Sequence, residues 1–484
     1  MWNAANVSFG LCPMLTRGAI EAIELRGSDT LKATYLPKLV SGEWTGTMNL
    51  TEPQAGSDLA AVRSRAEPQG DGTYKVFGQK IFITYGEHDL TDNIVHLVLA
   101  RVPGAPEGVK GISLFVVPKF LVNPDGSLGA RNDVRCVSIE HKLGIHGSPT
   151  AVLAFGDQGG ATGWLVGEEN RGLEYMFIMM NAARFSVGIE GVGLAERAYQ
   201  RALAYARERV QGGELGAKSR DKVAIIRHPD VRRMLLSMKS RTEAMRALAC
   251  MVAAAMDNAH SHADDAQRQQ AQAFVDLMIP VVKGWSTENA IDIASLGVQI
   301  HGGMGFIEET GAAQHLRDAR ITTIYEGTTG IQAADLIGRK IARENGRTIG
   351  LVIEQMRAVA QQLLDDGDAT LQVIAGALGQ GIVALEQAVD FIVRNYEAQV
   401  RNVSVGSVPF LELFGIVAGG WQLAHAALIA RQRLAAGSAE QDFYRAKLLT
   451  ARFYADHLLA KAGGLAHSVV NGGDAALELD DGQF

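Results

Sequence analysis

The sequence is poor in cysteine. Its 484 residues contain only Cys12, Cys136 and Cys250, which lie far apart in the chain. An odd number of widely spaced cysteines fits reduced thiols in a cytosolic protein better than a disulfide framework. We therefore expect a cytoplasmic protein in which neither thiol chemistry nor a metal site is implied.

Long apolar runs and blocks of positive charge are also missing. No uninterrupted apolar stretch reaches the roughly 18 to 20 residues of a membrane span, and the N-terminus lacks the basic start of a secretory signal. These absences predict a soluble, intracellular protein with no membrane span. The formal net charge is -7 and the basic residues form no long block, so we expect no nucleic-acid partner.

The chain is nevertheless long and apolar enough for a large interior. With 47% hydrophobic residues over 484 positions, it should divide into two or three domains. Residues 14–40 have apolar side chains at helical spacing, and Ser28 is placed to cap the second half of that segment. We therefore expect the chain to begin with helices.

From about residue 45 the pattern changes to short strands. Runs rich in β-branched and aromatic residues are bounded by Gly, Pro, Asp and Asn. These runs cover 74–78, 80–84, 94–101, 112–118 and 151–155. Because no helical segment separates them, they predict an antiparallel sheet or small barrel rather than a doubly wound α/β fold.

After Gly172 the apolar spacing becomes helical and mostly stays so. Two histidines and two aspartates lie close together between His260 and Asp265, and we interpret them as a solvated loop between helices rather than a metal site. A further helical section follows the polar, Gly-containing segment 343–348. The whole pattern predicts an α+β chain with a β-domain at 45–170, a helical bundle at 171–345 and a helical C-terminal extension at 350–484.

Two segments near the predicted sheet carry polar groups that suit a ligand. MNLTEPQAGSDLAAV, residues 48–62, places hydroxyls and accessible backbone N–H groups in a loop, which suits a flat heteroaromatic ring or a phosphate. KIFIT, residues 80–84, alternates Phe82 and Thr84 with isoleucines, so an aromatic ring and a hydroxyl should share one face of a strand. Taken alone, the loop is more often an ordinary turn and the strand face is more often core.

Two segments of the helical region are also candidates. VQIHGGMGFIEE, residues 298–309, has glycines that let a backbone approach a phosphate, but it lacks the strand and βαβ frame of a dinucleotide fingerprint. In residues 316–340, Glu326 lies between an aromatic residue and a glycine before a helical stretch. An apolar setting would raise the pKa of that carboxyl, as a general base for a weak carbon acid needs. A lone glutamate there is more often a solvated residue that stabilises the helix dipole.

All four segments occur together and in order, and the chain from about 45 to 345 resembles the acyl-CoA dehydrogenase family. The family motifs TEPxAGSD, a WIT-like strand, GGxGF and YEGT are matched by TEPQAGSD, KIFIT, GGMGF and YEGT. The motif EGTTGIQ, with Gly330, and the C-terminal extension most resemble those of the larger subfamily that contains 3-methylmercaptopropionyl-CoA dehydrogenases. The resemblance makes residues 1–44 the remnant of a shortened N-terminal helical domain.

The resemblance implies an FAD cofactor and an acyl-CoA substrate. The flavin contacts that it implies are Met48, Leu50, Thr51, Gly56, Ser57, Phe82, Thr84, Arg209, Gln299, Gly302, Gly303 and Thr328. The substrate contacts that it implies are Ser57, Arg184, Tyr325 and Gly327. Arg209 would reach the flavin pyrophosphate of a neighbouring subunit. The implied partners are an electron-transfer flavoprotein and further copies of the chain, in a homodimer or homotetramer.

The implied reaction is α,β-dehydrogenation in fatty acid metabolism. Glu326 would remove the α-proton of the thioester while a β-hydride moves to the flavin N5 atom, which yields a trans-2-enoyl-CoA. The Glu326 backbone N–H and a flavin ribityl hydroxyl would polarise the thioester oxygen. Some family members carry the base on the helix just before the conserved arginine, but here that residue is Ala183, which favours Glu326 as the sole base. By subfamily, 3-methylthiopropanoyl-CoA is a candidate substrate.

Two other functions remain open. An acyl-CoA oxidase would pass the electrons to oxygen, and the sequence does not distinguish it from a dehydrogenase. A non-catalytic flavin-binding protein of the stress response that associates with DNA uses the same fold. The acidic balance and the presence of Glu326 argue against that second alternative.

Overall fold

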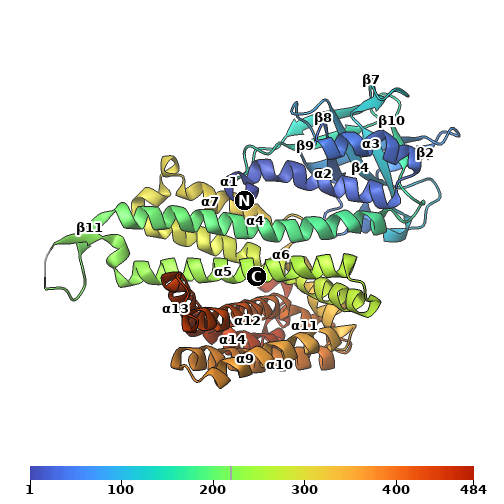
Figure 1. The fold of residues 1–484 in the computed structure, drawn as a ribbon. Coiled ribbons are helices and arrows are strands. Elements are labelled where there is room, and N and C mark those ends of the chain that lie inside the picture. Colours follow the sequence, from blue (N-terminus) through green and yellow to red (C-terminus); the bar gives the residue numbers. More distant parts are fainter. Residues whose placement is uncertain (219–220) are drawn as a thin grey trace. The chain divides into compact units, whose positions relative to one another are not determined.

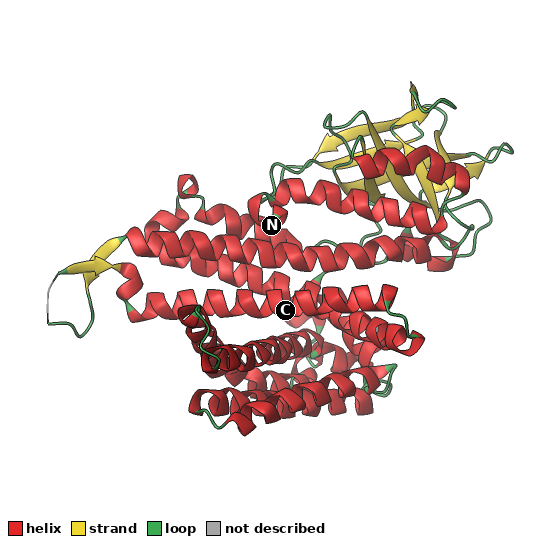
Figure 2. Ribbon diagram, in the orientation of Figure 1, coloured by secondary structure: helices red, strands yellow, loops and turns green. Residues whose placement is uncertain are grey.

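The computed structural model describes residues 1–218 and 221–484, and these form two compact units, Met1–Ser186 and Val187–Phe484. The strands of the first unit and the helices of the second are distinguished by colour in Figure 2. The division between the units falls inside one long helix, α4, which spans Gly172–Glu208. Its start at Gly172 is where the helical spacing of the sequence begins, as predicted.

The first unit begins with three helices, α1 (Trp2–Ala5), α2 (Val7–Arg26) and α3 (Asp29–Ser41). The side chain of Asn6 accepts a hydrogen bond from the Phe9 N–H and caps α2. Ser28 accepts one from the Leu31 N–H at 3.3 Å and caps α3, as predicted. The helical segment starts at Val7 rather than at residue 14, because Asn6 caps it there and the buried Val7 and Leu11 extend the apolar spacing towards the N-terminus.

A sheet of eight strands follows the helices (Figure 1), in the order β1-β4-β5-β10-β3-β9-β8 with β2 on β3. Its strands are β1 (Trp44–Asn49), β2 (Arg65–Pro68), β3 (Tyr74–Thr84), β4 (Asn93–Ala100), β5 (Ser113–Pro118), β8 (Val134–Ile139), β9 (Thr150–Phe155) and β10 (Ala161–Leu165). A separate hairpin pairs β6 (Phe120–Val122) with β7 (Leu128–Arg131). The predicted antiparallel sheet is confirmed with one exception, since β1 pairs with β4 in parallel. The long connection through β2 and β3 lets the chain return in the same direction, which a tight turn does not allow.

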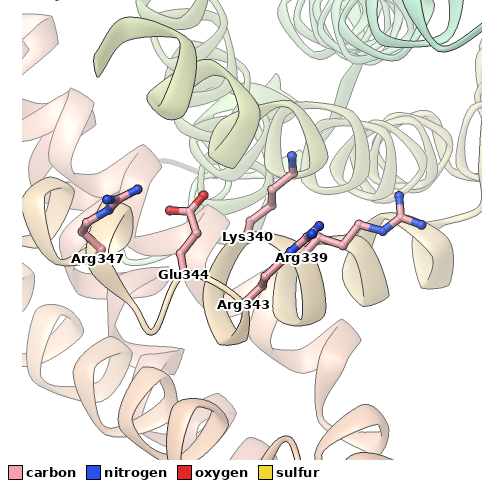
Figure 3. Close-up of a pocket in the computed structure, with 5 residues that line it drawn as sticks. All are labelled: Arg339, Lys340, Arg343, Glu344 and Arg347. Carbon is pink, nitrogen blue, oxygen red and sulfur yellow. The ribbon is translucent and has the colours of Figure 1, made fainter. Parts of the chain in front are cut away.

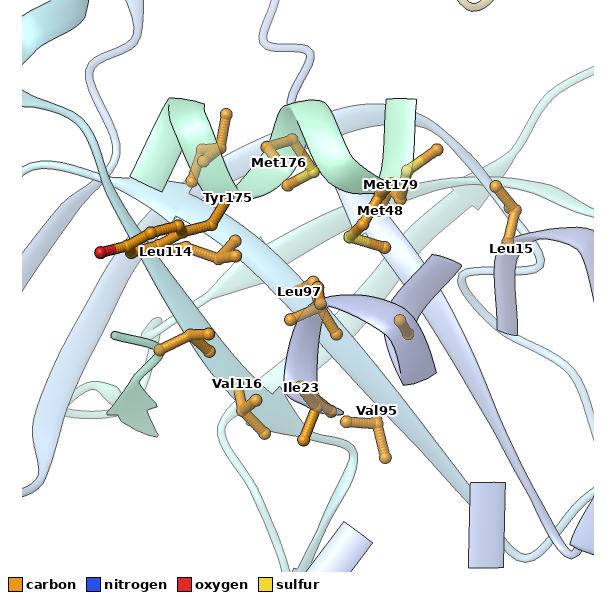
Figure 4. Close-up of a cluster of buried hydrophobic side chains, with 14 of the residues drawn as sticks. Leu15, Ile23, Met48, Val95, Leu97, Leu114, Val116, Tyr175, Met176 and Met179 are labelled. Carbon is orange, nitrogen blue, oxygen red and sulfur yellow. The ribbon is translucent and has the colours of Figure 1, made fainter. Parts of the chain in front are cut away.

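The main core of the first unit lies between α2, the sheet and the start of α4. Figure 4 shows Tyr175, Met176 and Met179 of α4 near Leu97 and Leu114 of the sheet. All of these side chains are buried, and each contributes roughly 1.5–3 kcal/mol by leaving water. The apolar side chains of α2 and of the first turns of α4 therefore pack against the sheet.

Strand β4 is buried on both of its faces. Val95, Leu97 and Leu99 belong to the core under the helices, whereas Val98 and Ala100 belong to a second core within the sheet. This explains why residues 94–100 are apolar in the sequence at every position except His96, rather than alternating between apolar and polar.

The second unit consists mainly of helices (Figure 1). After α4 come a hairpin of β11 (Val210–Gly213) and β12 (Lys222–Ala224), and then α5 (Pro229–Ser261), α6 (Asp265–His301), α7 (Ala312–Arg320), α8 (Thr329–Asp335), a π-helical segment (Leu336–Ala342), α9 (Arg347–Asp366), α10 (Ala369–Asn395), α11 (Val400–Val405), α12 (Ser407–Ala435), α13 (Gln441–His457), α14 (Ala462–Asn471) and α15 (Gly473–Leu477). The short segment 262–264 joins α5 to α6, so the histidine and aspartate cluster lies at an inter-helix loop, as predicted.

Helix α12 is the centre of the C-terminal helices and packs directly on the bundle. It contacts α5, α6, α9, α10, α13 and α14. Gly415 permits a close approach to α6, because a Cβ atom there would lie 2.2 Å from Cγ of Trp285. The Tyr454 hydroxyl of α13 donates to the Ile416 carbonyl at 3.0 Å. The segment 350–484 and the bundle therefore share one compact unit.

Within the described residues, two helices have the length and hydropathy of a membrane span. They are α10 and α12, with mean hydropathies of 1.3 and 1.5 over their most apolar windows. In α12, 78% of that window is buried inside the fold, and α10 packs against α9, α12, α13 and α14. Both are core helices of the C-terminal section.

Candidate functional site

In the first unit, the TEPQAGSD loop is held by a buried ion pair. Glu52 and Lys80 have side chains that are 3% and 0% exposed, and the Lys80 Nζ lies 2.8 Å from the Glu52 Oε1. The same ammonium donates to the Leu50 carbonyl at 3.0 Å. Lys80 thus ties the start of the loop to β3.

The Glu52 carboxylate also holds the far end of the loop. It accepts hydrogen bonds from the Arg63 N–H at 2.8 Å and from the Ser64 N–H at 3.1 Å. Burial alone would raise the pKa of Glu52, but the Lys80 ammonium and the donated hydrogen bonds lower it to about 2. The carboxylate is therefore ionised at neutral pH and closes the loop from 52 to 64. Neither charged residue was predicted for the site; the available signal was a lysine directly before the apolar residues Ile81 to Ile83.

Strand β3 bulges where the KIFIT motif lies. The pairing with β9 shifts between Lys80 and Ile83, and Phe82 has a left-handed φ of 59°. The strict alternation expected for this segment is therefore interrupted, because the extra residue of a bulge breaks the period of two. As a result Phe82 is 60% exposed, while Lys80 and Ile83 are both buried.

The remaining predicted residues of the first unit lie on or beside this loop and strand, with one exception. Thr51, half-buried, accepts a hydrogen bond at its carbonyl from the Ile81 N–H at 3.0 Å, which brings the loop next to the bulge. Gly56 and Ser57 are exposed, Leu50 and Thr84 are half-buried, and Met48 is buried in β1. Arg184 is buried in α4, apart from the loop in sequence.

In the second unit, Glu326 stands in a left-handed turn that leads into α8. Its φ is 55° and that of Gly327 is 87°. A left-handed conformation is strained for a residue with a side chain, and such strain persists only where the surroundings hold it. Thr328 follows and caps α8 by accepting a hydrogen bond from the Ile331 N–H at 3.2 Å.

The turn is held by two polar side chains of the second unit. The Lys283 Nζ of α6, fully buried, donates to the Gly327 carbonyl at 2.6 Å. The Gln332 amide, also fully buried, donates to the Glu326 carbonyl at 3.2 Å. Both carbonyls thus have donors, which compensates for the strained backbone. Sequence reasoning missed Lys283, because nothing near it in the chain marks its distant partner.

Tyr325 is joined to a buried carboxyl of α4. Its hydroxyl donates a short hydrogen bond to the Oε2 atom of Glu190, which is 0% exposed. Burial raises the pKa of Glu190 to about 8, with a further contribution from the Glu326 charge. Burial and the Glu190 charge also raise the pKa of Tyr325 well above its usual range. The second unit therefore brings together Glu190, Tyr325 and Glu326, of which only Glu190 was not predicted.

The GGMGF motif forms a 3-10 helix, Gly302–Phe306, at the end of α6. Gly302 and Gly303 are exposed, and a Cβ atom at either would meet no atom within 4 Å. Gln299, one turn earlier, is exposed as well. Arg209 is exposed directly after the end of α4. These four residues form accessible surface rather than core.

A pocket of about 530 Å³ lies elsewhere in the second unit, where the π-helical segment meets α9. Figure 3 shows its lining side chains, Arg339, Lys340, Arg343, Glu344 and Arg347. None of the predicted site residues lines it. Two of its cations lie near acids, since Arg339 is 3.5 Å from Asp335 and Lys340 is 3.9 Å from Asp276. We interpret it as a solvated helix junction.

Three family models together match most of the chain. Residues 47–158 match the acyl-CoA dehydrogenase middle domain, and residues 170–342 match the acyl-CoA dehydrogenase C-terminal domain. Residues 352–480 match the model described as acetyl-CoA dehydrogenase C-terminal like. The three matches follow one another in the order that the motifs predicted.

Curated relatives match over nearly the whole chain. The 3-methylmercaptopropionyl-CoA dehydrogenase of Ruegeria pomeroyi is 53% identical over 98% of this chain and 80% of its own length. The broad-specificity linear acyl-CoA dehydrogenase FadE5 of Mycobacterium tuberculosis is 39% identical over 91% of this chain and 74% of its own length. At these identities the relatives share the family of this chain.

Solved structures share the fold. An acyl-CoA dehydrogenase complexed with FAD from Bacillus anthracis has a TM-score of 0.73 at 23% identity, covering 96% of this chain and 74% of that one. Caenorhabditis elegans ACDH-11 in complex with C11-CoA has a TM-score of 0.76 at 23% identity, covering 93% of this chain and 72% of that one. The chain therefore belongs to the acyl-CoA dehydrogenase family, and it is an FAD-dependent enzyme that dehydrogenates acyl-CoA thioesters.

Proposed function

We propose that Glu326 is the base that removes the α-proton of the acyl-CoA substrate. The observation that carries this proposal is its left-handed backbone, φ 55°, in a turn whose carbonyls accept from Lys283 and Gln332. Strain of this kind is concentrated at functional sites, because a fixed turn orients a reactive group. The α-proton beside a thioester is weakly acidic, so polarisation of the carbonyl by the Glu326 N–H would assist its removal.

The cofactor contacts are part of the same proposal. In the first unit, the exposed Phe82 ring and the half-buried Thr51 and Thr84 suit a flat, polar heteroaromatic system. In the second unit, Gly302 and Gly303 leave open backbone for the approach of a phosphate. The further flavin contacts that we propose are Met48, Leu50, Gly56, Ser57, Arg209, Gln299 and Thr328. FAD, when bound, supplies the acceptor for the hydride that leaves the β-carbon.

Substitution of Glu326 tests the base. Glu326→Gln keeps the size of the side chain and removes its basicity, so we expect FAD to bind normally while the rate of flavin reduction by acyl-CoA falls by roughly 10²–10⁴-fold. Anaerobic stopped-flow measurement of flavin bleaching reports that rate. Glu354→Gln, at an exposed residue of α9 in the same unit, is the matched control and should reduce its flavin at the parent rate. Bleaching at the parent rate in Glu326→Gln would refute the assignment.

We propose 3-methylthiopropanoyl-CoA as the substrate. The support is the 53% identity to a dehydrogenase named for that thioester. Arg184, Tyr325, Gly327 and Ser57 are the residues that we propose to contact the substrate. Anaerobic titration of the FAD-loaded enzyme with a panel of acyl-CoAs, including butyryl-CoA, tests this choice. A linear acyl-CoA that reduces the flavin far faster than the methylthio compound would exclude it.

We further propose that an electron-transfer flavoprotein reoxidises the enzyme and that the chain forms a homodimer or homotetramer. Family resemblance supports both the electron acceptor and the oligomer. Arg209 is exposed in this chain, as a contact to a neighbouring subunit requires. Peroxide release in air during turnover would favour the oxidase alternative instead. Sedimentation equilibrium gives the oligomeric state, and Arg209→Gln should weaken FAD retention without changing the fold.

A further inference from the structure

We propose that Glu190 is a positioning residue for the dehydrogenation. In its protonated form it anchors the Tyr325 hydroxyl and so fixes the turn that carries Glu326. This inference rests on the proposed role of Glu326 as the base. Glu190 contacts the turn and not the reacting atoms, so its effect on the reaction is indirect.

The first support is the geometry of the contact. Glu190 lies on α4, 135 residues before Tyr325 in sequence, and its Oε2 atom accepts the hydrogen bond of the Tyr325 hydroxyl. Tyr325 directly precedes Glu326, whose left-handed backbone begins the turn. The phenol therefore links α4 to the turn, while Lys283 and Gln332 hold the turn carbonyls. Movement of the Tyr325 ring would move its neighbour.

The second support is the incomplete hydrogen bonding of the Glu190 carboxyl. Its Oε1 atom is buried and has no hydrogen-bond partner in the described part of the chain. A buried carboxylate with a single hydrogen-bond donor is far more unfavourable than a neutral acid in the same place. The site therefore suits a protonated carboxyl.

The third support is the set of charges that face Glu190. The turn contributes the Tyr325 hydroxyl and the Glu326 carboxylate, and α6 contributes the Lys283 ammonium. Burial, together with the negative charge of Glu326, raises the pKa of Glu190 to about 8, although the Tyr325 hydrogen bond and Lys283 act in the opposite direction. Two nearby carboxyls resist double ionisation, so a neutral Glu190 lets Glu326 carry the charge that a base needs.

The consequence is a titration that belongs to Glu190 rather than to the base. As pH rises through about 8, Glu190 ionises next to an already charged Glu326. Repulsion between the two carboxylates then displaces the turn, and misplacement of a reacting group by about 1 Å can lower a rate by roughly 10²-fold. The rate of flavin reduction should therefore fall on the alkaline side with this ionisation.

The experiment compares Glu190→Gln, Glu190→Ala and Tyr325→Phe, each loaded with FAD. Glu190→Gln keeps an acceptor for the Tyr325 hydroxyl but has no proton to lose, so the alkaline fall in the reduction rate should disappear. Glu190→Ala and Tyr325→Phe each remove the hydrogen bond, and we expect a roughly 10- to 100-fold lower rate with little change in the half-saturating substrate concentration. Because both remove one interaction, their double variant should be no slower than the slower single variant.

A spectroscopic measurement is independent of activity. Difference infrared spectra of the parent enzyme should show the band of a protonated carboxyl that disappears near pH 8 and is absent from Glu190→Gln. Glu196→Gln, six residues further along α4 at a carboxylate paired with Arg246, is the control and should keep both the band and the pH profile. Should the Glu190 variants fail to fold, Tyr325→Phe retains the test.

The proposal is overturned if Glu190→Gln keeps the alkaline fall of the parent, or if Tyr325→Phe reduces its flavin at the parent rate. Failure of the underlying function is recognised separately. If Glu326→Gln bleached its flavin as fast as the parent, the base assignment would fall even though the infrared band of Glu190 remained.

Discussion

Replacement of Lys80 by methionine should destabilise the first unit strongly. The Lys80 ammonium is fully buried and is bonded to Glu52 at 2.8 Å and to the Leu50 carbonyl at 3.0 Å. Methionine fills a similar volume but leaves the Glu52 carboxylate buried without its counter-charge. Removing one partner of a buried pair costs about 3–5 kcal/mol, because the remaining charge stays desolvated.

The same pair gives the acid dependence of this unit. The pKa of Glu52 is lowered from 4.5 to about 2, which corresponds to about 3 kcal/mol of linkage for this buried group. Because the folded pKa lies below the unfolded one, this stabilisation is complete above pH 4.5 and is lost as pH falls towards 2. In Lys80→Met that acid-dependent loss should become much smaller, since the charge that lowers the pKa is gone.

Hydrogen exchange measures the effect where it arises. The Arg63 and Ser64 amides donate to Glu52, so their opening free energy should fall by about 3–5 kcal/mol in Lys80→Met. Lys75→Met, on the same strand at a half-buried residue, is the control and should change these amides by less than about 1 kcal/mol. Adding Glu52→Gln to Lys80→Met should restore part of the loss. Equal protection of both amides in Lys80→Met and the parent would refute the reasoning.

Two further predictions concern the helices of the second unit. Gly415→Ala places a methyl group 2.2 Å from Trp285 Cγ, so thermal unfolding should show that the free energy of unfolding falls by about 1–3 kcal/mol. Gly376→Ala in α10, where a Cβ atom meets no atom within 4 Å, is the control and should raise the free energy of unfolding by up to about 1 kcal/mol. Equal unfolding midpoints for the two variants would contradict this packing. Asp368→Ala removes the side chain that accepts from the Thr370 and Leu371 N–H groups at the start of α10 and should cost about 1 kcal/mol, which Asp368→Asn should largely restore.

Local features of the fold followed from the sequence. The start of α4 at Gly172 and the Ser28 cap depend only on residues within a few positions, so spacing and residue type were sufficient to predict them. The strands around β4 were equally visible as short β-branched runs between turn residues. Family membership followed from four motifs that occur in the same order as in the family. A single motif would not have supported it.

Contacts between distant residues were decided by the tertiary structure alone. The parallel pairing of β1 with β4 and the bulge at Phe82 depend on which strands become neighbours, and strand periodicity carries no such information. Burial of Lys80 against Glu52, and of Glu190 against Tyr325, is likewise invisible in the chain order. A charged side chain is usually solvated, and only the packed interior determines that it loses water and must find a partner.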